Sequence, residues 1–517
     1  MTQNRRILIN ILASYGRSVF ALFCGLFSAR WVLNALGHED FGLYGLIGGL
    51  TIFITFFNGL MAGATSRFYA FSVGSAQVAE DKSTGIEECR AWFNTALMIH
   101  LFLPLILILI GYPIGYKIVV EFLSIPPEKL YVCIWVLRFV SVSCFIAMIN
   151  VPFQAMFTAK QYIAELTVYS FAQTICTFLL AYYMISHPGD WLQRYALYMS
   201  LLQVLPQIMI CIRAWKVFPE CKIDFRYWWK WKRVREMWSY AGWQAFAGVG
   251  GICRGQGMAM LINKYFGPQI NASMTIANQV SSHTMMLSGA MVGAFQPAIT
   301  NACGARKYEW MRLMAFRACK FGTLLILIFL IPLAVEIHEV LSIWLKNPPP
   351  YTESLCLCML GVLVIDKSTV GHMVAVNANG KVALYQAFLG SALIFTLPIA
   401  WILVLCDVGV ISVGYAFLVA TALSAWGRTY FAQKLVGMNM KYWFHKVFLP
   451  LSTLILCSAG AGLLSRLFMC PSVSRIFVTT VFVEVVLLPL SWLILFSADE
   501  RIYVKSVICK RLNGIWR

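Results

Sequence analysis

The sequence predicts an all-α integral membrane protein with about fourteen transmembrane helices, and its composition and its apolar runs carry this prediction. Hydrophobic residues make up 60% of the chain and charged residues only 12%, whereas soluble domains average about 45–50% and 25%. The mean hydropathy is +0.73. The apolar residues fall in runs of about 20, the length that a helix needs to cross about 30 Å of hydrocarbon. No strand pattern and no hydrophilic stretch long enough for a soluble domain competes with this interpretation.

The first expected helix covers residues 13–36 and contains only Arg17 and Arg30 as charged residues. It ends in a short polar turn, and the next apolar run begins at once, so the two helices form a tight surface hairpin. Two arginines precede the first run, as in a signal peptide, but the run is too long and has no convincing small-residue cleavage site. The segment is therefore expected to stay uncleaved.

The remaining spans follow from windows of about 20 apolar residues. They are expected at 41–63, 91–116, 130–157, 163–185, 193–216, 237–262, 273–299, 317–340, 353–376, 383–405, 409–432, 446–468 and 475–497. An even number of spans puts both termini on one side. With these boundaries, 29 Lys and Arg residues fall on the side of the termini, Arg67 and Arg428 among them, and 7 on the other. The excess of positive charge predicts that both termini are cytoplasmic.

A basic and aromatic segment divides the chain into two similar halves. We expect an N-terminal six-helix lobe at 1–216, a cytoplasmic linker at 217–236, a C-terminal six-helix lobe at 237–445, and two appended helices with a basic tail at 446–517. Short matches, 14–16 with 239–242 and 36–40 with 266–270, open and close the first helix of each lobe. Six helices return the chain to its starting side, so the repeats are expected to be parallel.

The linker mixes Trp with Lys and Arg just before a span. Aromatic rings at headgroup depth and cations near an anionic leaflet are what an interfacial helix needs. We therefore expect an interfacial linker helix on the inner leaflet, with docking of a partner as the alternative.

The motifs of common enzymes are absent from the sequence. It has no P-loop, no H-E-x-x-H and no nucleophile elbow, and its 16 Cys form no C-x-x-C pair. We therefore expect no enzymatic activity, no metal, no cofactor and no disulfide framework. The formal charge of +19 lies in alternate loops, so it reflects membrane topology and not nucleic-acid binding. Without an ATP site, uphill movement must be driven by an ion gradient, by membrane potential or by consumption of the product.

Ionisable residues inside the expected spans are the informative ones, because a charge at the bilayer centre costs at least about 2.5–3.5 kcal/mol. The cations outnumber the anions and are Arg17, Arg30, Arg138, Arg254 and Lys367, whereas the acids are Asp366 and Glu484. Arg30 and Arg254 each lie about 17 residues into the first helix of their lobe. At similar depth, the two side chains could face each other across a central cavity.

Each of the other ionisable residues also has a purely structural interpretation. Arg17 and Arg138 lie near helix ends, where long side chains reach the interface. Lys367 adjoins Asp366, which could neutralise it locally, and Glu484 lies in the appended helices, where it could cap or pair. Small residues around Arg254, such as Gly251 and Gly255, allow close helix approach beside the charge.

Residues 29–44, ARWVLNALGHEDFGLY, and residues 271–280, NASMTIANQV, resemble bacterial polysaccharide exporters. These include the O-antigen flippases of the multidrug/oligosaccharidyl-lipid/polysaccharide (MOP) exporter superfamily. The resemblance implies two MATE-like six-helix lobes around a cavity that opens alternately to the cytoplasm and the periplasm. It also implies a multi-pass protein of the bacterial inner membrane that acts as a monomer, with membrane lipid and a polysaccharide polymerase or assembly proteins as partners.

The cargo implied by the resemblance is a polyprenyl-pyrophosphate-linked oligosaccharide, an O-antigen or capsule repeat unit. Buried arginines hold a pyrophosphate by charge-assisted hydrogen bonds. We expect Arg30 and Arg254 to hold the phosphates, with Arg17, Arg138 and Lys367 as secondary cavity cations. Asp366 is a candidate for binding a coupling proton.

Three alternatives remain. A cation-coupled drug exporter of the same superfamily needs intramembrane carboxylates, yet the first helix of each lobe carries arginine and no acid. A lipid II flippase shares the anionic cargo and is not separated by the sequence. A non-transport membrane scaffold, such as an assembly subunit for a polymerase, predicts that apolar replacement of the intramembrane arginines is tolerated, whereas changes in surface loops abolish function.

Overall fold

The computed structural model describes residues 3–49, 52–78, 82–122, 125–187, 189–345 and 348–502. Throughout these ranges the regular elements are helices, and no strand occurs among them. The chain is therefore an all-α membrane protein, as predicted. Of the described helices, eight are long and apolar enough to cross a membrane, and nine if a bent pair counts as one span.

Two compact units make up the chain. The first comprises Met1–Ala245 and Gly293–Met311, and the second comprises Phe246–Val292 and Arg312–Arg517. The segment 293–311, which the sequence division assigns to the C-terminal lobe, thus belongs to the first unit. The amide of Asn301 in this segment donates to the carbonyl of Ala159 at 2.9 Å, which ties the segment to α4.

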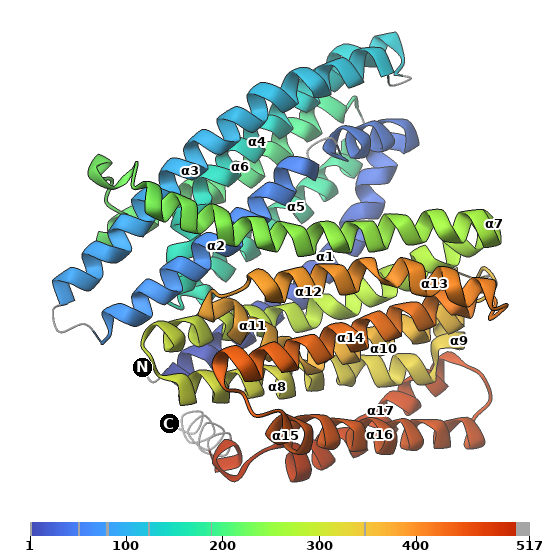
Figure 1. Ribbon diagram of the computed structural model, residues 1–517. Coiled ribbons are helices and arrows are strands. Elements are labelled where there is room, and N and C mark those ends of the chain that lie inside the picture. The colour runs from blue at the N-terminus through green and yellow to red at the C-terminus, as the bar shows by residue number, and fades with distance from the viewer. Residues whose placement is uncertain are drawn as a thin grey trace, which may run out of the picture. The chain divides into compact units, whose positions relative to one another are not determined.

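The first unit contains α1 to α6 and both ends of α7. Its helices are α1 (Gln3–Gly49), α2 (Ile52–Ala76), α3 (Lys82–Lys117), α4 (Pro127–Ala159), α5 (Ile163–Ser186), α6 (Leu192–Val217) and α7 (Trp231–Gly304), and a short π-helix (Ile118–Phe122) continues α3. Helix α4 packs against α6, α2 and α3, and α1 packs against α5. Figure 1 shows α3, α4 and α6 running side by side.

The second unit is built around α14. It contains the middle of α7, all but the first turn of α8 (Tyr308–Val335), and the helices α9 (Ile337–Leu345), α10 (Thr352–Ser368), α11 (Val370–Asn379), α12 (Ala383–Ile394), α13 (Thr396–Leu405), α14 (Ile411–Val436), α15 (Met440–Trp443), α16 (Leu449–Phe468) and α17 (Val473–Leu490). Helices α10 to α13 all contact α14, and α16 and α17 pack together as a pair (Figure 1).

Within the described residues, each of the fourteen expected spans corresponds to helix. The first span and the start of the second lie in α1, which is interrupted at Gly37 (φ 77°, ψ 168°), and the second span continues in α2. Spans seven and eight share α7, which is interrupted at Gly267 (φ 82°, ψ 177°). This backbone conformation is essentially restricted to glycine. The two glycines stand in the paired segments 36–40 and 266–270, so their matching geometry supports the internal repeat.

The sequence interpretation counts Arg67 and Arg428 with the cytoplasmic loops, but both lie within helices, where they contact other side chains. Arg67 lies in α2, which runs thirteen residues beyond the expected end of that span, and its guanidinium lies 4.6 Å from the Phe68 ring and 5.2 Å from the Tyr240 ring. Arg428 lies in α14 and is only 8% exposed. Hydropathy windows end where charges begin, whereas a helix continues wherever a buried charge finds partners.

The linker is not an interfacial helix. It forms two 3₁₀ turns, Pro219–Cys221 and Phe225–Tyr227, before α7 begins at Trp231. Side chains of α3 form hydrogen bonds with three of its backbone groups, as described below. We call residues 218–235, which comprise these turns and the first turn of α7, the strap.

Candidate functional site

Arg254 lines a pocket of about 140 Å³ in the second unit. The pocket lies between the two segments of α7 on either side of Gly267 and α14. Its lining comprises Gly251, Arg254, Gly255, Met258, Ala259, Asn271, Met274, Thr275, Asn278 and Phe417.

The break at Gly267 creates this pocket, because it turns α7 back so that its two segments lie against each other. Glycines on the Arg254 segment keep the space open. A methyl group added at Gly251 or at Gly255 would meet no atom within 4 Å. The Gly-rich run that attracted attention in the sequence therefore provides room beside the charge.

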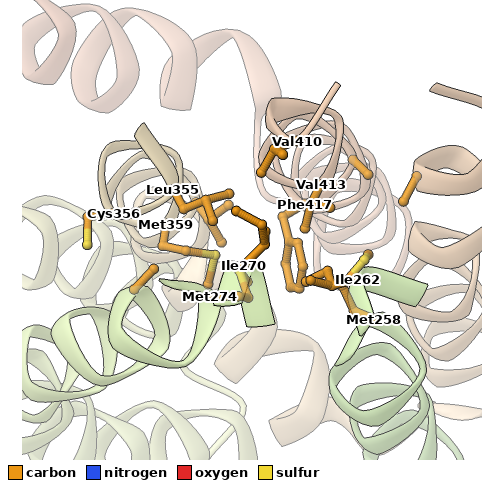
Figure 2. Close-up of a cluster of buried hydrophobic side chains, with 14 of the residues drawn as sticks. Met258, Ile262, Ile270, Met274, Leu355, Cys356, Met359, Val410, Val413 and Phe417 are labelled. Atoms are coloured by element: carbon orange, nitrogen blue, oxygen red, sulfur yellow. The ribbon is translucent and has the colours of Figure 1, made fainter. Parts of the chain in front are cut away.

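The floor of the pocket is apolar. Met258, Met274 and Phe417 belong to a buried hydrophobic cluster formed by α7, α9, α10, α13 and α14, and Figure 2 shows Met258 and Phe417 close to Ile262 within it. The polar part of the lining is Asn271, Thr275 and Asn278, three residues on the second segment of α7. A packed floor and one wall of amides and hydroxyl can orient a small polar group.

The guanidinium of Arg254 is positioned by α14. Its carbon lies 4.1 Å from the centroid of the Phe417 ring, a cation–π contact, and its Nη2 donates to the Thr421 hydroxyl at 3.5 Å. Among the described residues Arg254 forms no ion pair within 4 Å, and the carboxylate of Asp366 acts on it electrostatically. Donors of this guanidinium therefore remain available to a ligand.

Asp366, at the end of α10, is the centre of a compact ion cluster. Its Oδ1 lies 2.7 Å from Nη1 of Arg428, and its Oδ2 lies 3.1 Å from Nζ of Lys367. The side chains of Arg428 and Lys367 are 10% and 11% exposed, and that of Asp366 is 28% exposed. Two cations thus hold one carboxylate.

The cluster also holds a broken helix. Helices α10 and α11 meet at a bend of 45°, which frees backbone carbonyls that must find donors inside a membrane. Nη1 of Arg428 donates to the carbonyl of Asp366 at 3.1 Å, and Nε1 of Trp443 donates to the carbonyl of Ser368 at 2.9 Å. Arg428 therefore has a structural role at the bend.

Pocket and cluster together carry an excess of positive charge. Arg254, Lys367 and Arg428 contribute three cations, and Asp366 contributes the one carboxylate in this group. A guanidinium with free donors in such surroundings is suited to a phosphate or another oxyanion. In the described part of the chain, no group of three His, Cys, Asp or Glu residues could hold a metal.

The other expected cavity cations belong to the first unit. Arg17 lies half-buried on α1. Arg30 lies on α1 as well, but its side chain falls outside the described part of the structure. Arg138 is exposed on α4, where its Nε donates to the Tyr112 hydroxyl at 3.2 Å and its guanidinium lies 4.9 Å from the Trp135 ring.

The structure thus brings together Arg254, Asp366 and Lys367, and it adds Arg428 to them. Arg428 was missed because it was counted with the loop cations, although it lies within the expected span 409–432, so an inventory of charges inside that span would have found it. Arg30 lies seven residues before Gly37, whereas Arg254 lies thirteen residues before Gly267. Measured from the equivalent glycines, the two arginines are therefore not at equal depth.

Comparisons with known proteins show similarity at the level of structure. No protein-family model matches the sequence, and no curated protein matches it. An outward-facing multidrug resistance MATE family transporter of the MOP superfamily superposes with a TM-score of 0.68 at 13% identity, over 85% of this chain and 97% of that chain. A MATE in complex with MaL6 gives 0.66 at 15% identity, over 85% and 98%.

A third structure is a MOP superfamily transporter from Pyrococcus furiosus, described as having a binding pocket of reverse polarity that suggests a different function. It superposes with a TM-score of 0.60 at 15% identity, over 84% of this chain and 97% of that chain. Each of these likenesses covers nearly the whole of the known transporter. The chain has the MATE-like fold of the MOP superfamily transporters.

Proposed function

We propose that this protein is a flippase that moves a polyprenyl-pyrophosphate-linked oligosaccharide across the bacterial inner membrane by alternating access. The observation that carries the proposal is the positive polarity of the second unit, where Arg254 has no carboxylate partner among the described residues and lines a pocket. A pyrophosphate carries two or more negative charges and accepts hydrogen bonds of the kind that a guanidinium donates.

The size of the pocket limits which part of the cargo it takes. A cavity of about 150 Å³ holds a molecule the size of benzene, so a pocket of about 140 Å³ accommodates a pyrophosphate and not an oligosaccharide. The amides of Asn271 and Asn278 and the hydroxyl of Thr275 would then contact phosphate oxygens or the first sugar. The lipid tail would remain in the bilayer.

The topology that goes with this proposal puts both termini in the cytoplasm, because most of the Lys and Arg lie on their side. Flipping would be driven by an ion gradient, by the membrane potential or by consumption of the product. A polysaccharide polymerase or other assembly proteins would be the partners that consume it. Arg17, Arg30, Arg138 and Lys367 remain secondary candidates for contact with the cargo.

A cation-coupled drug exporter is the second candidate, because similar structures include a multidrug resistance MATE transporter. Such an exporter needs an intramembrane carboxylate that exchanges a cation. Asp366 is held by Arg428 and Lys367 at 2.7 and 3.1 Å, which disfavours this role. The similar MOP superfamily transporter from Pyrococcus furiosus has a binding pocket of reverse polarity, which suggests a different function for that protein.

The test measures surface glycan and accumulated lipid-linked precursor in cells that carry Arg254→Ala or Arg30→Ala at normal protein level. The matched control is Lys264→Ala, which removes an exposed cation from the same helix as Arg254. We expect Arg254→Ala to lose glycan and to trap precursor on the cytoplasmic leaflet, and the control to behave as the wild type. Accumulation of lipid II instead of a glycan precursor would identify a lipid II flippase.

Other outcomes would overturn the proposal at defined points. Normal glycan in both arginine variants would remove the assigned site. Normal glycan after deletion of the whole gene would leave the drug exporter or the scaffold, and drug sensitivity of the deletion strain would separate these two.

A further inference from the structure

The strap is fastened to α3 along its inner face. The Asn94 side chain donates to the carbonyl of Lys222 at 3.0 Å and accepts from the backbone N–H of Asp224 at 2.7 Å. The Thr95 hydroxyl donates to the carbonyl of Tyr227 at 3.0 Å. The carboxylate of Asp224 also lies 3.5 Å from Nη2 of Arg90. These contacts fix the conformation of a segment that has little regular structure of its own.

Burial along α3 shows which part of this helix is covered by other parts of the protein. All ten residues from 91 to 100 are buried, whereas the next turns of the helix expose large apolar side chains, among them Leu105, Ile106 and Leu109. Trp228 and Trp229 lie at the boundary, with ring centroids 6.4 and 5.8 Å from that of Phe102. The strap therefore ends where the lipid-facing surface of α3 begins.

The same helix gives the depth of the strap in the membrane. Lys117 and Glu121, both exposed and 3.7 Å apart, mark the far boundary of the apolar stretch. A hydrocarbon core of about 30 Å corresponds to about 20 helical residues, which places the near boundary close to Leu97. Thr95 and Phe102, which contact the strap, flank this position. The strap thus lies at the interface, on the side that we propose to be cytoplasmic.

The outer face of the strap has no protein partner in the described part of the chain that would explain its composition. Phe225, Trp229 and Trp231 are 73%, 71% and 74% exposed. Lys230, Lys232 and Arg235 are exposed between and beside them and form no ion pair among the described residues. Six cations and two acids give residues 218–235 a net charge of +4.

We propose that the strap is a binding site for the headgroups of anionic phospholipids of the inner leaflet. Indole rings prefer the headgroup region, and cations close to an anionic leaflet are attracted to it. Because α3 holds the strap at the interface, its aromatic side chains can enter the headgroup layer without rearrangement. The occupant is lipid and not an acidic protein, since three large aromatic side chains at this depth would otherwise face the bilayer without a role.

The test titrates the purified full-length protein in detergent with phosphatidylglycerol and with phosphatidylcholine, and native mass spectrometry counts the bound lipids. The variant Lys230→Ala/Lys232→Ala/Arg235→Ala removes three unpaired cations and leaves the Asp224 contacts intact. The control, Lys434→Ala/Lys441→Ala/Lys446→Ala, removes three exposed lysines of the second unit. We expect the strap variant to bind phosphatidylglycerol at least about tenfold more weakly, and the control to change less than about twofold.

Two further arms separate the explanations. Exchange of the cations for one another, Lys230→Arg/Lys232→Arg/Arg235→Lys, is expected to keep the affinity of the wild type. Trp229→Ala/Trp231→Ala is expected to weaken phosphatidylglycerol binding while binding of polyglutamate, which has charge but no acyl chain, stays unchanged. The proposal would be overturned if the strap variant and the Lys434→Ala/Lys441→Ala/Lys446→Ala control lost affinity equally, or if the wild type bound both lipids equally well. Binding of polyglutamate as tight as that of phosphatidylglycerol would also overturn it. None of these outcomes depends on what the protein transports.

Discussion

Asp366→Asn separates a structural carboxylate from a coupling carboxylate. In the structure, Asp366 holds Arg428 at 2.7 Å and Lys367 at 3.1 Å. The asparagine keeps the shape and one acceptor but removes the charge, so two nearly buried cations are left facing each other without compensation. If Asp366 is structural, the main effect of the substitution is therefore a loss of stability.

The size of this loss follows from the two distances. At an effective dielectric constant of about 20, the gross attractions are about 6 and about 5 kcal/mol. Desolvation offsets much of this, and removal of one partner from a buried pair costs about 3–5 kcal/mol net. Because 28% of the Asp366 side chain is exposed, we expect the low end, about 3 kcal/mol. For a unit of about 250 residues this corresponds to a fall in Tm of about 6–12 °C.

Thermal unfolding of the purified protein in detergent measures the shift, with Asp407→Asn in an exposed turn as the matched control. In the double variant Asp366→Asn/Arg428→Gln, the loss should be smaller than the sum of the single losses, since one stranded cation is gone. An unchanged Tm in Asp366→Asn together with abolished transport would refute the reasoning. That result would show that Asp366 exchanges a cation instead of holding the helix bend.

Three other substitutions test separate parts of the fold. Gly267→Ala should lower the free energy of unfolding by about 1–3 kcal/mol, because φ is 82° and ψ is 177° there. The control Gly242→Ala, in a regular and open helical position, should not lower it. Equal effects of the two substitutions would contradict the assigned backbone strain. Arg475→Gln leaves the buried Glu336 carboxylate, 2.8 Å away, without its counter-ion and should lower the free energy of unfolding by about 3–5 kcal/mol. Proteolysis between α16 and α17 should become faster. An unaltered digestion pattern would argue against a stabilising role of this ion pair. Burial opposes ionisation of Glu500, but Lys320 at 3.0 Å and Arg317 hold the pKa of Glu500 below its usual value. The loss of Tm in Glu500→Gln should therefore be complete at pH 7 and should shrink as the pH falls below about 4.5, where the wild-type carboxylate becomes protonated. A loss of Tm that persists in acid would exclude the charge as its cause.

Sequence hydropathy located each of the eight or nine helices of the described part of the chain that are long and apolar enough to cross a membrane, because the bilayer imposes one length and one composition on each crossing helix. Hydropathy did not locate the bend between α10 and α11, since such a bend depends on which side chain satisfies the freed carbonyls. Arg428 supplies that donor from a helix about 60 positions further along the chain. A window of 20 residues contains no information on such a distant contact.

The candidate site was predictable in its chemistry and less so in its partners. Arg254 stands out in the sequence as a cation among small residues within a span, and the structure gives it a pocket. Lys367 stands out for the same reason, yet it pairs with its neighbour Asp366. Charge inside a span identifies both residues equally, and the difference lies in what each cation contacts. Lys367 pairs with Asp366, which also binds Arg428 of α14, whereas Arg254 contacts the Phe417 ring of α14. Tertiary packing decides which cation is free to meet a ligand.

The equivalent glycines also show how the two halves have diverged. Counted back from Gly37 and Gly267, the position that corresponds to Arg254 in the first half is Cys24, which is buried at 8% exposure, and the position that corresponds to Arg30 in the second half is Met260, which is 74% exposed. The six-residue offset amounts to about 9 Å along a helix. The repeat therefore reproduces the hairpin and its glycine but not the charge. A role for Arg254 rests on its own pocket and on the surplus of cations around Asp366, and it does not require Arg30 as a symmetric partner.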